Sequence, residues 1–106
     1  MIKPGHYFAT IKETQLLLER GPWRLVEIVF HLPHGEILST RLAGKRLDRV
    51  YRELLGTQDA LHQDINSLVD KECVICYGVI RGTKTMADTF YINEVHSTEG
   101  FIKTKR

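Results

Sequence analysis

The sequence contains few cysteines and no long apolar run, and both absences narrow the class of protein. Two cysteines among 106 residues are too few for a disulfide framework. A transmembrane helix needs about 18 or more consecutive apolar residues, and no such run is present. The segment from Met1 to His6 has neither an apolar signal-peptide core nor a small-residue cleavage site. We therefore expect a cytoplasmic protein without a membrane segment.

A strong net charge is also absent. The chain carries 15 Lys and Arg against 13 Asp and Glu, a formal net charge of +2. This balance permits a nucleic-acid partner but does not require one. The positions of the charges are more informative, because Arg41 to Arg52 holds five cations and one acid, and Lys103 to Arg106 holds three cations and no acid. We expect one domain over residues 1–102, followed by a basic C-terminal tail over 103–106.

Motifs that carry catalysis are missing. The chain has no Gly-rich phosphate loop and no G-x-S-x-G nucleophile elbow, and its acids are scattered without a D-x-D or E-x-x-H pair. We predict no catalytic residue, no cofactor and no enzymatic activity.

The two cysteines form a CxxC pair, Cys73 and Cys76, which raises the question of a metal or redox site. The intervening residues are Val74 and Ile75, which favour a strand rather than the tight turn of a zinc knuckle. Residues three apart on a strand point to opposite faces, so the two thiols would not share a metal. We predict two strand residues and no metal site, with cysteine acting as a small apolar side chain.

The hydrophobic period changes along the chain and predicts a mainly β protein with one or two helices. Alternating apolar residues indicate strands, and an apolar stripe from Leu47 to Leu55 indicates an amphipathic helix with Gly56 as its C-terminal cap. Asp64 is a candidate cap for a second, short helix. The predicted strands cover residues 6–18, 23–32, 37–42, 72–81 and 89–97, and the main helix covers 45–55.

The same helix carries Arg46, Arg49 and Arg52 at intervals of three. This spacing is typical of a solvated face, and we expect pairing with Asp48 and Glu53.

The order β-β-β-α-β-β predicts a five-stranded OB-fold-like barrel, a small and partly open Greek-key barrel. The opening Pro4-Gly5-His6-Tyr7-Phe8-Ala9-Thr10-Ile11 resembles the start of small phage and mobile-element OB-fold proteins that bind single-stranded DNA. Leu25 to Phe30 followed by Gly35 is similar to their second strand and turn. Asp64 to Lys71 is similar to their "D-L-x-x-L-x-G-K" segment, with Asp70 where that pattern has glycine. The resemblance implies noncatalytic binding of single-stranded DNA in replication or recombination.

An OB barrel binds a single strand on its second and third strands and the adjoining loops, using cations for phosphates and aromatic rings for bases. For Trp23 and Tyr91 two roles stay open, packing within the protein and stacking on a base. Phe8 and Tyr77 are expected in the core. The predicted nucleic-acid-binding residues are Lys12, Arg20, Trp23, Arg24, Arg41, Arg81, Lys84 and Tyr91.

A second hypothesis is an OB-fold accessory subunit that binds a polymerase, primase, helicase or recombinase. The run Leu16-Leu17-Leu18 and Val29 would then be covered by the partner or by a second copy of the chain. The mild net charge favours this alternative, because a dedicated strand binder usually has a stronger basic signal.

Overall fold

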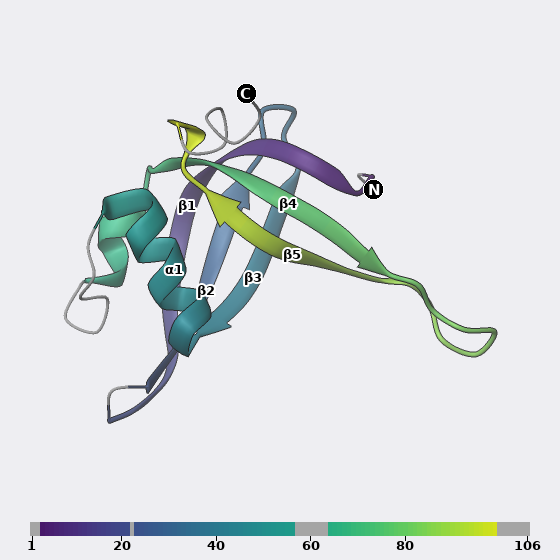
Figure 1. The fold of residues 1–106 in the computed structure, drawn as a ribbon, viewed down its shortest axis with the longest axis horizontal. Helices are drawn as coiled ribbons and strands as arrows, with labels where there is room; N and C mark the ends of the chain where they lie inside the picture. Colours follow the sequence, from purple (N-terminus) through teal and green to yellow (C-terminus); the bar gives the residue numbers. More distant parts are fainter. Residues whose placement is uncertain (1–2, 22, 57–63, 100–106) are drawn as a thin grey trace.

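Strand β1 (Gly5–Arg20) is the centre of the sheet, because it pairs with a different strand on each of its edges. The computed structural model describes residues 3–21, 23–56 and 64–99. The segment of β1 from Gly5 to Thr10 pairs with β4 (Glu72–Ile80), and the segment from Thr10 to Arg20 pairs with β2 (Trp23–His31). Figure 1 shows β1 curving between these two neighbours.

The remaining elements complete one antiparallel sheet of five strands. Strand β3 (Ile37–Ala43) pairs with β2, and β5 (Thr89–His96) pairs with β4, which gives the strand order β3-β2-β1-β4-β5. Helix α1 (Gly44–Leu55) and the 3₁₀ helix η2 (Ile65–Leu68) lie between β3 and β4 in the chain. The mainly β prediction and the element order are confirmed. The predicted tail, residues 103–106, lies outside the described residues, so the predicted domain limits remain predictions.

The expected closure of the barrel is not confirmed. Within the described residues β3 and β5 form no hydrogen-bonded ladder, although their Cα atoms come within 8 Å of each other. Helix α1 contacts both strands and lies beside the ends of both in Figure 1. The sheet is therefore curled but has an open seam between β3 and β5. No helix in the described ranges is long and apolar enough to cross a bilayer.

Two irregularities in β1 bend the sheet. Its register with β2 shifts between Ile11 and Glu13 and again between Leu16 and Leu18. A β-bulge adds a residue to one strand, which increases its twist and changes the face that later side chains occupy. After the first shift Thr14, rather than Glu13, pairs with buried Ile28. The shift thus keeps a carboxylate out of the core.

The core is formed by the inner face of the sheet and the apolar stripe of α1. Every second residue of β2 from Val26 to Phe30 is fully buried, as the alternation predicts, and Leu47, Val50 and Tyr51 of α1 pack against them. The predicted caps are confirmed: Gly56 ends α1 with φ of 69°, and Asp64 Oδ1 accepts a 2.9 Å hydrogen bond from the Asn66 N–H.

Tyr51 places a polar group, its hydroxyl, inside this apolar core. Its ring is fully buried, and its hydroxyl has no hydrogen-bond partner in the described part of the chain. Burial raises the pKa of this phenol, although the nearby Arg24 guanidinium acts in the opposite direction.

We predict that Tyr51→Phe stabilises the protein by about 1 kcal/mol, because a buried hydroxyl without a partner costs about 1–3 kcal/mol. Urea unfolding would show a higher midpoint at an unchanged m-value. Tyr51→Leu is the control and should lower the midpoint, since it removes ring packing. A lower midpoint for Tyr51→Phe would mean that the hydroxyl makes a stabilising contact.

Candidate nucleic-acid interface

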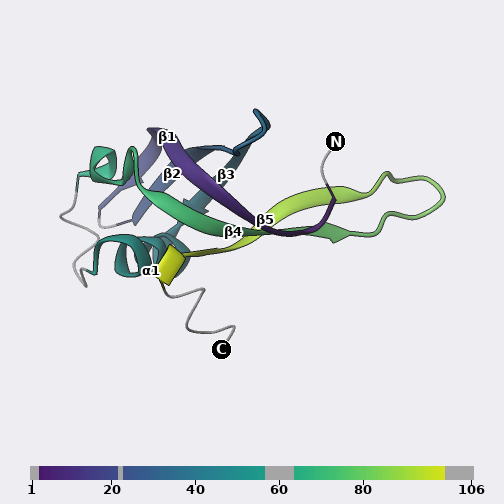
Figure 2. The same cartoon turned by 90° about the horizontal axis from the view of Figure 1, so that it is seen from above.

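The β4–β5 hairpin projects from the body of the molecule. Strand β1 begins at Gly5, opposite Tyr77, so in the described part of the chain the pairs from Gly78 with Tyr91 to Ile80 with Thr89 have no third strand beside them. Figure 2 shows this two-stranded ribbon extending beyond the rest of the sheet. An isolated two-stranded hairpin is marginally stable in water, so the arm needs stabilising contacts of its own.

Aromatic rings supply such contacts at the base of the arm. Tyr77 and Phe90 stack on one face, with ring centroids 5.5 Å apart and planes 9° from parallel. On the other face Tyr91 lies across Gly78, and a Cβ at position 78 would come within 3.1 Å of Tyr91 Cζ. The Tyr91 side chain remains 37% exposed. Gly78 therefore positions one side of the Tyr91 ring, and the exposed part remains available to a base.

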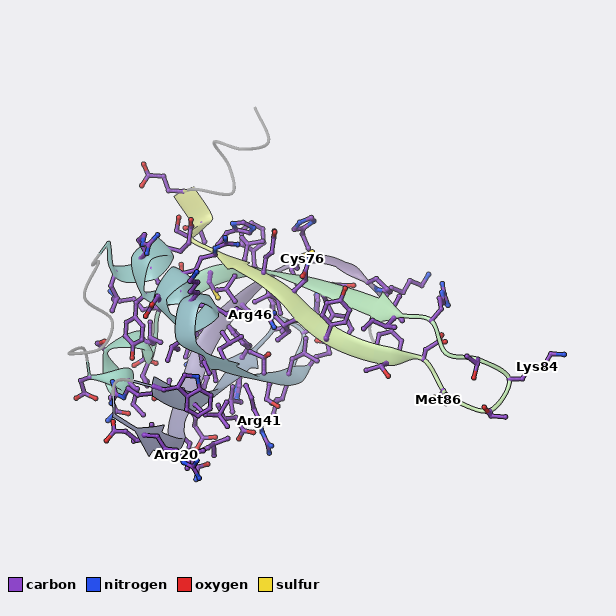
Figure 3. All side chains as sticks on the ribbon, turned by 60° about the horizontal axis from the view of Figure 1, so that its bottom comes forward. Arg20, Arg41, Arg46, Cys76, Lys84 and Met86 are labelled. Carbon is purple, nitrogen blue, oxygen red and sulfur yellow. The ribbon has the colours of Figure 1, made fainter. Side chains whose placement is uncertain are left out.

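Asp88 orders the loop at the end of the arm. Its Oδ1 accepts a 2.8 Å hydrogen bond from the Gly82 N–H, and its Oδ2 lies 3.1 Å from Arg81 Nη1. The Gly82 N–H bond, followed by the Arg81 guanidinium, lowers the pKa of this carboxyl. Backbone bonds in both directions between Thr83 and Met86 close the turn. Figure 3 shows Lys84 and Met86 at the tip.

The β1–β2 turn carries three of the predicted residues, but they face different ways. Arg20 pairs in register with Trp23, which is 41% exposed and whose indole Nε1 lies close to Gly44 at the start of α1. Arg24 shares the inner face with Val26, and its Nε lies 3.1 Å from Glu19 Oε2. Arg20 and Trp23 therefore remain candidates for strand contacts, whereas Arg24 is turned toward the interior.

The outer face of β2 and β3, where we expected the strand to bind, carries acids as well as cations. Arg41 does point outward, opposite to Leu42, but its Nε lies 3.3 Å from Glu27 Oε2 on the neighbouring strand. Glu13 and Glu27 also line a shallow hollow on this face together with Val29. The first bulge of β1 causes this, because it turns Glu13 outward. Phosphates would meet two carboxylates at the centre of this face.

Lys12 lies apart from the other predicted residues. It occupies the first bulge, with its Nζ 3.7 Å from Asp70 Oδ1, and lines a hollow with Pro33 and Glu72. Phe8 borders the same hollow and is 57% exposed, so its predicted place in the core is wrong. Its side chain alternates with inward-facing Tyr7 and Ala9 and therefore points outward.

The structure brings together Arg81, Lys84 and Tyr91 on the arm, and Arg20 and Trp23 at the β1–β2 turn. Figure 3 places Arg20 and Lys84 at opposite ends of the molecule. Sequence analysis missed two exposed apolar residues of the arm, Ile80 and Met86, and the positioning of Tyr91 by Gly78. A glycine inside an apolar strand was the available signal, since such a glycine often marks a close approach.

Both cysteines are residues of strand β4 and face opposite sides of it, as predicted. Cys73 is fully buried on the inner face of β4, and Cys76 is half-buried on the opposite face, where Figure 3 labels it. Burial raises the pKa of the Cys73 thiol to about 12, so it is protonated at neutral pH and is a poor ligand or nucleophile. Among the described residues no group of His, Cys, Asp and Glu is arranged to hold a metal ion.

No protein-family model matches the chain, and no curated protein has significant similarity to it.

Because the pKa of Asp88 is lowered in the folded protein, its contribution to loop order is complete above the ordinary Asp pKa of about 3.9. The contribution is lost as the pH falls through the lower native value. We predict that the Gly82 amide resonance in ¹⁵N–¹H spectra shifts with a midpoint below 3.9. Asp88→Asn is the control and should abolish this transition. A midpoint at or above the ordinary value would contradict the assigned hydrogen bond.

Proposed function

We propose that the protein is a noncatalytic, cytoplasmic single-stranded DNA-binding protein that acts in replication or recombination, as part of a phage or mobile element. One observation carries the proposal. An aromatic ring, Tyr91, is positioned by Gly78 on a projecting arm that also bears Arg81 and Lys84. Stacking rings combined with cations are the means by which proteins hold single strands without reading their sequence.

We also propose that the sheet is an OB-like barrel opened along the β3–β5 seam. The strand order β3-β2-β1-β4-β5 and the approach of β3 to β5 support this. Asp70 adds support from a single residue, because it has φ of 70° at the place where the related pattern has glycine. Glycine adopts left-handed backbone more easily than other residues do, so the chain keeps the turn while changing the residue.

The cations of the arm can contact phosphates at a small cost in free energy. Arg81 is paired with Asp88, but its side chain is 82% exposed, and exposed ion pairs contribute at most about 1 kcal/mol. A guanidinium has several N–H donors, so Arg81 can contact a phosphate while it keeps Asp88. Glu13 and Glu27 disfavour a path across the centre of the outer face. The strand is therefore expected to follow the arm.

A second candidate function, the accessory subunit, is favoured by a different observation. Leu16 and Leu18 are 38% and 41% exposed at the end of β1, and the outer face is mixed in charge. A polymerase, primase, helicase or recombinase that covered this end would bury them. Wild-type protein that fails to bind oligo(dT) at low salt but forms a stable complex with such an enzyme would favour this function.

We predict that Tyr91→Ala weakens binding of fluorescein-labelled oligo(dT) about tenfold, because one stacked base contributes about 1–3 kcal/mol. Tyr91→Phe keeps the ring and should bind within about twofold of wild type on the same grounds. Fluorescence anisotropy measures both, and near-UV circular dichroism checks that the arm remains folded. Equal binding by Tyr91→Ala and wild type would exclude the arm as the stacking site.

We predict that the double variant Arg81→Gln/Lys84→Gln has a weaker salt dependence as well as a lower affinity. The slope of log K against log salt should become less negative by about 1.4, since each phosphate contact of a single strand contributes about 0.7. Lys71→Gln is the control, because Lys71 lies at the other end of β4, and it should leave the slope unchanged. An unchanged slope in the double variant would show that neither cation contacts phosphate.

A further inference from the structure

A groove lies beside the open seam, between α1 and β5. Four aliphatic core residues, which are almost fully buried, expose a small part of their surface on its floor: Leu42 of β3, Val50 of α1, and Ile92 and Val95 of β5. Its volume is about 160 Å³. The groove exists because β3 and β5 do not pair there, so α1 rather than a strand borders β5.

Three cations of α1 form the rim of this seam groove: Lys45, Arg46 and Arg49. Figure 3 shows Arg46 on the side of α1 nearest β5. Neither these rim cations nor Arg52 forms an ion pair with a described residue, so the expected pairing of the helix arginines with Asp48 and Glu53 is not found there. The Glu53 carboxylate instead accepts a 3.2 Å hydrogen bond from the Ser97 N–H.

Glu94 is the single acid among the described residues that border the groove, and its carboxylate already has a partner. Glu94 Oε2 lies 2.9 Å from His96 Nε2 on the same strand. The rim therefore carries three cations against one carboxylate that has another partner. Glu94 offsets only one of these cations, so the rim keeps an excess of positive charge that attracts an anionic ligand.

We propose that the seam groove binds an acidic peptide segment of a partner protein, with one aliphatic or aromatic side chain on the floor and flanking carboxylates on the rim. A cavity of about 150 Å³ lined by aliphatic and aromatic side chains accepts a benzene ring, so this groove has room for one such side chain. Arginine is suited to the carboxylates, because its planar fork matches their geometry.

A peptide fits the groove better than a nucleic acid does. Proteins that bind single strands stack the bases on aromatic rings, and none of the described residues that line this groove is aromatic. Phosphates alone would leave the aliphatic floor uncovered. The inference is independent of strand binding by the arm, since Arg81, Lys84 and Tyr91 do not line the groove.

A phage-displayed random peptide library panned on the full-length protein tests the proposal. Selection uses wild type, with counter-selection on Arg46→Glu/Arg49→Glu. Arg52→Glu/Lys71→Glu is the matched control, because it makes the same change in net charge at residues that do not line the groove. We expect enrichment of peptides with two or more acids next to Leu, Ile or Phe. By anisotropy, a labelled selected peptide should bind the groove variant at least about tenfold more weakly than the control variant.

A second variant changes the charge of the groove in the opposite direction. Glu94→Gln removes the only acid among the described residues of the groove and should tighten binding of the same peptide, which keeps the proposal testable if the charge-reversed helix unfolds. Labelled oligo(dT) is measured in parallel on every variant. Peptides without an acidic–apolar pattern, or equal binding by the groove and control variants, would overturn the proposal. So would a groove variant that loses oligo(dT) rather than peptide, which would make the groove a phosphate site. If wild type fails to bind oligo(dT), the proposed single-stranded DNA binding is wrong, but the groove proposal is unaffected.

Discussion

The shared pairing of β1 is the constraint on which the rest of the structure depends. This strand of 16 residues pairs with β4 through its first part and with β2 through its second part. A straight strand would hold these neighbours in a flat sheet, whereas two bulges increase the twist and allow the sheet to curl over its own apolar face. The first bulge also decides which side chains enter the core, because it turns Thr14 inward and Glu13 outward.

The position of β1 also creates the arm. Because β1 begins opposite Tyr77, the outer part of the β4–β5 hairpin has no neighbouring strand. Its order comes from short-range contacts: two stacked rings, a tyrosine over a glycine, and a carboxylate that binds the loop backbone. The groups that stabilise the arm are the same aromatic and charged types that bind nucleic acid. A stable arm therefore needs no separate set of residues to offer a ligand surface.

The period of the sequence predicts the elements well, because alternation along β2 and the stripe on α1 follow directly from which face is buried. It does not predict the bulges, since Ile11, Glu13 and Thr14 contain no local signal for an added residue. Two errors in the candidate site follow from long-range geometry. The acid-bearing outer face depends on the bulge, and the placement of Arg46 and Arg49 against β5 depends on a seam that residue spacing within the helix cannot reveal.

The open seam itself has a cost that explains its charge. The unpaired edges of β3 and β5 would invite strands from other chains, and proteins commonly protect such edges with cations and bulges. This molecule has both: the β4–β5 register shifts between Cys76 and Tyr77, and Lys45, Arg46 and Arg49 border β5. Cations alone are enough to protect a strand edge, however, and they would do so even if no groove lay beneath them. The aliphatic floor below the cations is what distinguishes a binding groove from a guarded edge, because a neutral neighbouring strand would cover the floor but leave the rim cations without counter-charges, whereas an acidic peptide with one apolar side chain satisfies both parts.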